Sequence, residues 1–218
     1  MSELLSRELR TQFGEIDIYL FDQLLRGRFD ACRTVLDAGC GEGRNLVYFL
    51  RAGTAVHGID RDPAAIMRVR ALAGELAPSL PPENFVAGEL DALPWQDESM
   101  DAVLCSAVLH FAADEAHFGG MLQEMWRVLK PGGMFFARLA SIIGLEAAVA
   151  LDQNRRARLP DGSTRFLVDE RFLVEWSERL GAALLDPLKT TNVQNQRCMT
   201  TWVLRKRANG VERTVQDR

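Results

Sequence analysis

The sequence lacks the features that mark several common classes of protein. Its 218 residues include only four cysteines and three histidines, and no two cysteines form a C-x-x-C pair. We therefore expect neither a disulfide framework nor a zinc site, and predict reduced, mostly buried thiols and no bound metal. No segment approaches the ~20 apolar residues of a membrane-spanning helix, which argues against a membrane partner.

An excess of positive charge is also missing. The formal net charge is −4 and the isoelectric point is near 5.5. Binding along a phosphate backbone requires clustered Lys and Arg, so we do not expect a nucleic-acid substrate. The basic run at 205–207 is interpreted as a solvated chain end. The first ten residues mix Glu and Arg with leucine, unlike a signal peptide, which predicts a cytoplasmic protein.

Strand and helix patterns alternate along most of the chain. This alternation is typical of a parallel sheet with helices on both faces. We predict an α/β fold with a doubly wound, Rossmann-like sheet of seven mostly parallel strands, of which the last two form an antiparallel hairpin at the C-terminal edge. The strands are expected at 33–38, 55–60, 85–87, 101–106, 134–139, 182–188 and 198–204.

The remaining segments complete the expected organisation. Apolar residues at helical spacing predict one or two helices near the N-terminus and an Ala-rich, then Arg-rich helix at 141–159. We divide the chain into an N-terminal helical cap (1–32), a main domain (33–207) and a polar C-terminal tail (208–218).

A glycine-rich turn, LDAGCGEG at 36–43, joins the first strand to a helix. Backbone must approach a ligand closely at such a turn, and glycine leaves the space, so a nucleotide-like ligand is indicated. Asp60 ends the second strand, where a carboxylate can accept both hydroxyls of a ribose. A dinucleotide fingerprint requires a third glycine where this sequence has Arg44, which disfavours a nicotinamide-dependent oxidoreductase.

Five ordered segments extend this pattern. They resemble, in order and spacing, the class I S-adenosylmethionine-dependent methyltransferases of type 11/12. The resemblance covers most of the chain and implies S-adenosylmethionine as cofactor and methyl transfer as activity. The segments are VLDAGCGEG (35–43), HGIDRDP (57–63), GELDALPW (88–95), DAVLCSAVLHF (101–111) and WRVLKPGG (126–133).

The resemblance implies roles within the glycine-rich turn. Asp37 and the backbone of Gly39 match the anchors of the methionine amino end. Gly41 and Gly43 match the positions where backbone approaches the cofactor closely. Cys40 belongs to the same loop, and we interpret it as a small packing residue rather than a nucleophile.

The same resemblance assigns residues to the nucleoside. Asp60 would hold the ribose, Arg61 would lie beside the adenine, and the Leu90 backbone N–H would meet an adenine ring nitrogen. Glu89 stands where the family usually has Asp to accept from the adenine amino group. Ser106 matches the wall near the methionine portion.

Residues for the methyl acceptor are expected beyond the strand ends. His110 follows the fourth strand at the ligand-binding edge of the sheet and is a candidate general base. Tyr19 from the N-terminal cap, and Arg138 and Arg165 from beyond the fifth strand, are candidates for acceptor binding.

The acceptor class follows from weaker signals. The segments 41–50 and 197–207 resemble the tellurite and thiopurine methyltransferase group. No base-plus-orienter pair is visible in the sequence, and a soft nucleophile needs none because it arrives ionised. We therefore predict a small-molecule acceptor, a thiol or chalcogen oxyanion. A non-catalytic S-adenosylmethionine-binding sensor or assembly protein is the alternative.

Overall fold

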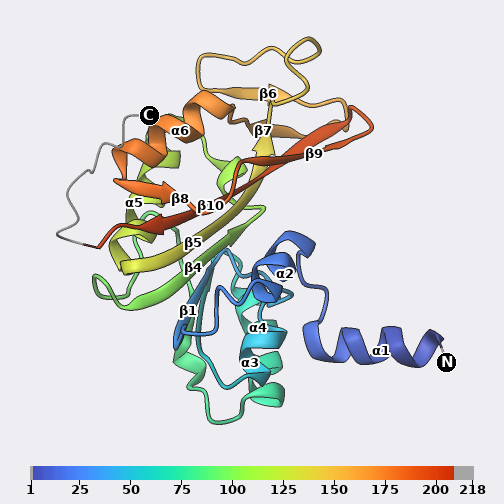
Figure 1. Ribbon diagram of the computed structural model, residues 1–218, viewed down its shortest axis with the longest axis vertical. Coiled ribbons are helices and arrows are strands. Elements are labelled where there is room, and N and C mark those ends of the chain that lie inside the picture. Colours follow the sequence, from blue (N-terminus) through green and yellow to red (C-terminus); the bar gives the residue numbers. More distant parts are fainter. Residues whose placement is uncertain (1, 209–218) are drawn as a thin grey trace, which may run out of the picture.

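The computed structural model describes residues 2–208, and a central mixed sheet is its middle layer (Figure 1). Within this range the sheet has eight strands in the order β3-β2-β1-β4-β5-β10-β8, with β9 also paired to β10. The first five strands in this order, from β3 to β5, run parallel to one another, and β10 runs antiparallel to β5, β8 and β9. The strands are β1 Thr34–Ala38, β2 Ala55–Asp60, β3 Phe85–Ala87, β4 Met100–Ser106, β5 Leu129–Ser141, β8 Ala182–Leu184, β9 Lys189–Val193 and β10 Arg197–Lys206.

Helices cover both faces of this sheet, and a small hairpin stands apart from it. Strands β6 (Arg156–Arg158) and β7 (Thr164–Phe166) form that antiparallel hairpin. The helices are α1 Ser2–Phe13, α2 Ile18–Leu25, α3 Val47–Arg51, α4 Pro63–Leu76, α5 Glu115–Val128 and α6 Glu170–Arg179, with short 3-10 turns η1 Pro82–Asn84 and η2 Leu109–Phe111.

The strands are apolar on both faces because each face packs against helices. Successive strand residues point to opposite sides, so Leu36 and Phe135 join the core under α5 and α6. Their neighbours Val35 and Phe136 join the core under α2, α3 and α4. The continuous apolar runs of the sequence are therefore buried central strands, and the predicted Rossmann-like α/β class is confirmed.

Aspartate caps fix where several helices begin. The side chain of Asp62 accepts a hydrogen bond from Ala64 N–H, and Pro63 occupies the first turn of α4. Asp114 and Asp169 cap α5 and α6 in the same way.

Four details of the sequence prediction were wrong. The sheet has eight strands rather than seven, because the polar segment 189–193 forms β9 alongside β10. Strand β8 is shorter than predicted, and β10 lies inside the sheet between β5 and its antiparallel partners β8 and β9.

The helix predicted at 141–159 is the fourth error. Strand β5 extends to Ser141, and turns and β6 follow it. The Asp152 side chain accepts the backbone N–H groups of Asn154 and Arg156, and Arg155 has a φ of +58°. Side chain to backbone hydrogen bonds of this kind compete with helix formation.

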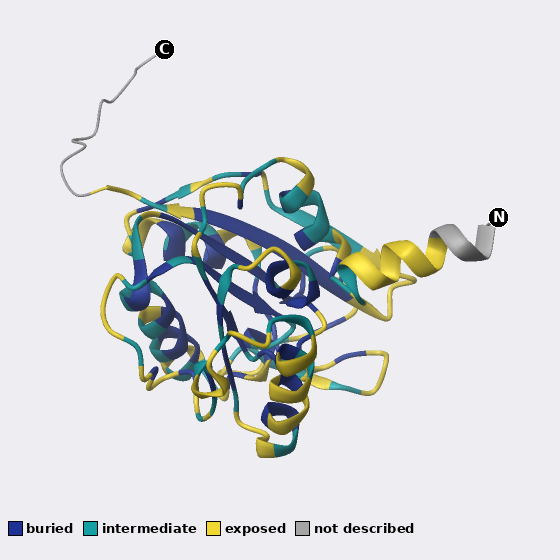
Figure 2. Cartoon of the chain, turned by 90° about the horizontal axis from the view of Figure 1, so that it is seen from below, coloured by how far each residue is buried: buried dark blue, intermediate teal, exposed yellow. Residues whose placement is uncertain are grey.

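The N-terminal helices differ in their attachment to the body. Helix α1 projects from the molecule, and its residues 6–12 are exposed (Figure 2). Helix α2 packs against the sheet layer through Leu20. The division into cap and main domain stays a prediction. In the part of the chain that is described, no helix is both long and apolar enough to cross a membrane. Most of the predicted polar tail, from 209 onward, lies outside the described residues.

Candidate functional site

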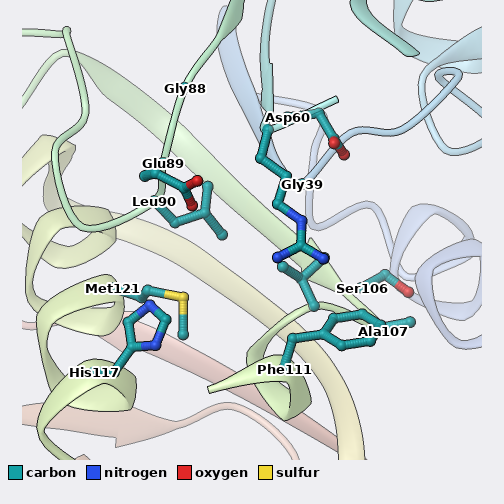
Figure 3. A pocket seen from close by; sticks show the side chains of 12 residues that line it. Gly39, Asp60, Gly88, Glu89, Leu90, Ser106, Ala107, Phe111, His117 and Met121 are labelled. Atoms are coloured by element: carbon teal, nitrogen blue, oxygen red, sulfur yellow. The ribbon is translucent and has the colours of Figure 1, made fainter. Parts of the chain in front are cut away.

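A cavity of about 240 Å³ opens at the carboxyl ends of the parallel strands. The strand order reverses between β1 and β4, and ligands of doubly wound sheets bind at that switch point. In Figure 3, Asp60 and Glu89 lie on one side of this cavity and Phe111 on another, with His117 and Met121 reaching it from α5. Its lining comprises Gly39, Asp60, Arg61, Gly88, Glu89, Leu90, Ser106, Ala107, Val108, Phe111, His117 and Met121.

The glycine-rich turn forms one wall and cannot tolerate side chains at two positions. Gly39 has a φ of +82°, and a Cβ there would lie 2.3 Å from Val108 Cγ2. Gly43 has a φ of +86°, and its Cβ would lie 2.8 Å from Val69 Cγ2. The N–H of Gly39 donates to Ile59 O, which ties the turn to β2. Glycine is thus required by backbone conformation and by space.

Asp60 is held by backbone at the end of β2. Its Oδ2 accepts the N–H of Gly41 at 2.9 Å, and its Oδ1 accepts the N–H of Asp62 at 3.0 Å. Each carboxylate oxygen has a second lone pair, so the group can still accept hydrogen bonds from ligand hydroxyls. The two backbone bonds fix its direction beforehand.

Asp37 is a buried carboxylate without a partner. Neither of its oxygens has a hydrogen bond, and the residue is 1% exposed. Burial raises its pKa to about 7, with Arg44 opposing and Asp60 reinforcing that rise. An unpaired buried carboxyl is costly, and a ligand cation would relieve the cost. Asp37 does not itself line the cavity, but it lies two positions before Gly39, which does line it.

A second cavity, of about 450 Å³, adjoins the first. The two share Ser106, Ala107 and Phe111 as lining residues. Ala107 has a φ of +64°, a strained conformation for a non-glycine residue and one that concentrates at functional sites. The second cavity is further lined by Arg44, His110, Arg138, Ala140, Leu159, Asp161, Ser163, Arg165, Val193, Arg197 and Met199.

His110 is held as a neutral hydrogen-bond donor in this cavity. Its Nδ1 accepts the backbone N–H of Ala140 at 3.3 Å, so the proton of the neutral ring lies on Nε2. Burial, together with the positive charges of Arg165, Arg138 and Arg197, lowers its pKa to about 4. The ring is therefore neutral at physiological pH.

Arg138 connects the second cavity to the N-terminal helices. Its Nη1 lies 3.2 Å from the buried carboxylate of Asp17, the N-cap of α2, and its guanidinium stacks over the ring of Tyr19. Asp17 also accepts from Ser106 Oγ at 3.2 Å. The hydroxyl of Tyr19 bonds to Thr191 Oγ1, and Tyr19 lines neither cavity. Tyr19 therefore contacts Arg138 from outside the cavity.

The structure brings most of the predicted site residues together in two groups. Gly39, Asp60, Arg61, Glu89, Leu90 and Ser106 line the first cavity, and His110, Arg138 and Arg165 line the second together with Ser106. Cys40 is buried in the turn that also contains Gly41 and Gly43.

Several lining residues were missed. Met121 belongs to an apolar helical stripe that is typical of core, and His117, four positions earlier on α5, carries no local signal of a site. Arg44 was noted only as a departure from a dinucleotide fingerprint. Arg197, which begins β10, carries no local signal of a site.

Comparison with known proteins gives a consistent result. Residues 36–137 match the Methyltransferase domain family. A probable S-adenosylmethionine-dependent methyltransferase of Mycolicibacterium smegmatis is 37% identical over 105 residues, covering 48% of this chain and 37% of that protein. The tRNA U34 carboxymethyltransferase of Idiomarina loihiensis is 30% identical over 175 residues, covering 78% of this chain and 52% of that protein. The chain thus spans about half the length of these curated relatives, or less.

Solved structures share the fold. An S-adenosylmethionine-dependent methyltransferase from Clostridium acetobutylicum superposes with a TM-score of 0.68 at 11% identity, covering 95% of this chain and 100% of that one. The 1,6-didemethyltoxoflavin-N1-methyltransferase of Burkholderia thailandensis gives a TM-score of 0.66 at 20% identity, covering 94% of this chain and 86% of that one. At such identities the likeness is one of fold.

Proposed function

The chain belongs to the class I S-adenosylmethionine-dependent methyltransferases, and on that basis we propose that it transfers a methyl group from S-adenosylmethionine to a small-molecule acceptor. The observation that carries the proposal is the shared wall of Ser106, Ala107 and Phe111 between two cavities. Methyl transfer requires a cofactor and an acceptor side by side, whereas a sensor requires the cofactor cavity alone.

The first cavity has groups that fit each part of the cofactor. Asp60 would accept from the ribose hydroxyls, and the segment with Glu89 and Leu90 would hold the adenine beside Arg61. The unpartnered carboxylate of Asp37 matches the amino group of the methionine end. When bound, the cofactor supplies a methyl group activated by a sulfonium.

The acceptor proposed is a soft nucleophile, a thiol or chalcogen oxyanion. His110 carries its ring proton on the nitrogen that does not bond to Ala140, so it donates rather than accepts. Hydrogen bonds from Ser163 lower the pKa of Asp161, which makes that carboxylate a weak base. A thiolate would need neither group as a base, because it is already ionised and carries the lone pair that would accept the methyl group.

An acceptor screen tests the activity. Purified protein is incubated with S-adenosylmethionine and thiol, selenite, tellurite, phenol or carboxylate acceptors, and S-adenosylhomocysteine release is measured. Release with a thiol or chalcogen acceptor supports the proposal, and release confined to oxygen acceptors contradicts the soft acceptor. Tight cofactor binding without release from any acceptor favours the sensor or assembly alternative.

The cofactor site has a separate binding test. Asp60→Ala should weaken S-adenosylhomocysteine binding by about 1.5–3 kcal/mol, the range for hydrogen bonds to charged groups. Asp62→Ala is the matched control, because Asp62 caps α4 but does not line the cavity. Calorimetry showing equal affinities for both variants and the wild type would remove Asp60 from the site. The cytoplasmic location and the exclusion of nucleic-acid substrates stay predictions.

A further inference from the structure

The second cavity is strongly basic in an acidic protein. Four arginines line it (Arg44, Arg138, Arg165 and Arg197), and Asp161 is the one acidic lining residue. The whole chain carries a formal charge of −4. This local reversal of charge lies next to the proposed cofactor cavity and so bears on what the acceptor is.

Not all of these guanidinium groups are satisfied by the protein. Asp17 lies 3.2 Å from Arg138 and 3.8 Å from Arg44, and so partly neutralises that pair. The Nε of Arg138 is nevertheless buried without a hydrogen-bond partner. An unpartnered buried donor beside a cavity indicates a missing acceptor atom.

The other two arginines lie across the cavity with few partners. Arg165 donates to its neighbour's backbone, Thr164 O, and stacks over Phe111 at 4.9 Å from the ring centroid. The side chain of Arg197 makes no hydrogen bond or ion pair with any described residue, and its charge helps to lower the pKa of both His110 and Asp161. Both keep planar donor groups available to an oxyanion.

Most of the remaining lining residues are apolar. Leu159 and Met199 are buried, and Phe111 and Val193 expose 48% and 40% of their surface. A small inorganic anion would leave these side chains uncovered. An organic molecule with one charged end would contact both parts of the lining.

We propose that the second cavity binds the methyl acceptor as a small organic acid. The carboxylate lies among Arg138, Arg165 and Arg197, with the Nε2–H of His110 as a further donor, and the apolar body lies against Phe111 and Met199. The nucleophilic atom then faces the shared wall. This inference rests on the proposed function and specifies its substrate class.

A pair of thiols that differ only in charge tests the inference. The binding of 2-mercaptobenzoate and of 2-mercaptobenzamide to protein saturated with S-adenosylhomocysteine is measured by calorimetry. We expect the acid to bind at least tenfold more tightly. Arg165→Gln and Arg197→Gln should each weaken binding of the acid by about 10- to 100-fold and leave the affinity for the amide unchanged. The reason is that only the acid forms a charge-assisted hydrogen bond with these arginines.

Arg158→Gln is the matched control, since Arg158 is exposed on β6 in the hairpin with Arg165 and does not line the cavity. It should leave both affinities unchanged. Equal binding of acid and amide in the wild type, or arginine-dependent binding of selenite without binding of the acid, would overturn the inference.

The affinity for S-adenosylhomocysteine distinguishes failure of the organic-acid inference from failure of the proposed function. Neither Arg165 nor Arg197 lines the first cavity, so the S-adenosylhomocysteine affinity of these variants should equal that of the wild type. If the wild type does not bind S-adenosylhomocysteine, the proposed function fails, and the acid is then titrated into the free protein to examine the second cavity alone.

Discussion

Asp37 is the residue whose ionisation should change most when the cofactor binds. Its folded pKa is raised above the ordinary value by burial, so the free protein holds a proton there up to about pH 7. The ammonium group of the ligand pairs only with the ionised form. Affinity for S-adenosylhomocysteine should therefore fall as the pH drops below about 7, by up to about tenfold per unit, with proton release on binding.

Calorimetry between pH 6 and 8, in two buffers of different ionisation enthalpy, measures both effects. Asp37→Asn is the control and should bind more weakly with little pH dependence in this range. A wild-type affinity that is constant from pH 6 to 8, without proton release, would mean that Asp37 does not pair with the ligand.

His110 gives a second prediction at this scale. The Nδ1 of His110 accepts a hydrogen bond from Ala140, and the pKa of the ring is lowered to about 4. The ring should therefore donate a hydrogen bond to the acceptor rather than remove a proton from it. His110→Gln keeps one acceptor and one donor, so turnover of a thiol should stay within about tenfold of the wild type. The pH profile should follow the ionisation of the thiol alone. A loss of ~10²–10⁴-fold in this variant would identify a general base instead.

Residue-level prediction from the sequence worked where a local pattern constrains the backbone. The glycine turn and Asp60 are adjacent to strand ends, so their place at the ligand-binding edge follows from the fold. Arg197 lies far from Arg138 along the chain, and only the antiparallel pairing of β10 with β5 brings them to one cavity. No local periodicity encodes that contact.

Among the elements, the N-terminal helices differ in what they contribute to the sites. Among its described side chains α1 has none that lines either cavity, whereas α2 presents its cap, Asp17, to Arg138 and Ser106. Residues of α2 and its following turn also pair with Asp186 before β9, through Gln23 and Arg28. Helix α2 therefore holds lining residues of the second cavity in place through its cap, and α1 does not.

Two truncations test this difference. Removing residues 1–12 should leave S-adenosylhomocysteine affinity unchanged and the melting temperature within a few degrees, since residues 6–12 of α1 are exposed. Removing 1–28 should lower the melting temperature more and weaken acceptor binding, because the partner of Arg138 is lost. If the shorter truncation alone abolishes cofactor binding, α1 acts as a lid over the cofactor.

Packing between elements explains why the segment 141–159 is not the predicted helix. Its alanines favour helix locally, yet Ile142, Leu145 and Val149 are buried against Leu167 and Cys198 from later segments. That packing and the turn around Asp152 override propensity. Helix α5, by contrast, has a continuous apolar stripe and an aspartate cap, so local pattern and packing agree there.

For the whole molecule, the distribution of charge decides between acceptor classes. One relative is named as a tRNA U34 carboxymethyltransferase, but this chain is acidic overall, and four of its arginines gather in a single cavity of about 450 Å³. A phosphate backbone requires basic residues spread along an extended surface rather than gathered in one cavity. We therefore predict small-molecule binding that depends on salt and negligible binding of tRNA.

The prediction is checked by fluorescence anisotropy and calorimetry across a salt series. Labelled tRNA should bind more weakly than the ~10⁻⁴–10⁻⁶ M of ordinary non-specific complexes, even at low salt. The affinity of 2-mercaptobenzoate should fall several-fold between about 50 and 500 mM NaCl, since salt screens its attraction to the arginines, while 2-mercaptobenzamide should change little. Micromolar tRNA binding with a steep salt slope would instead show that the acidic net charge conceals a nucleic-acid surface.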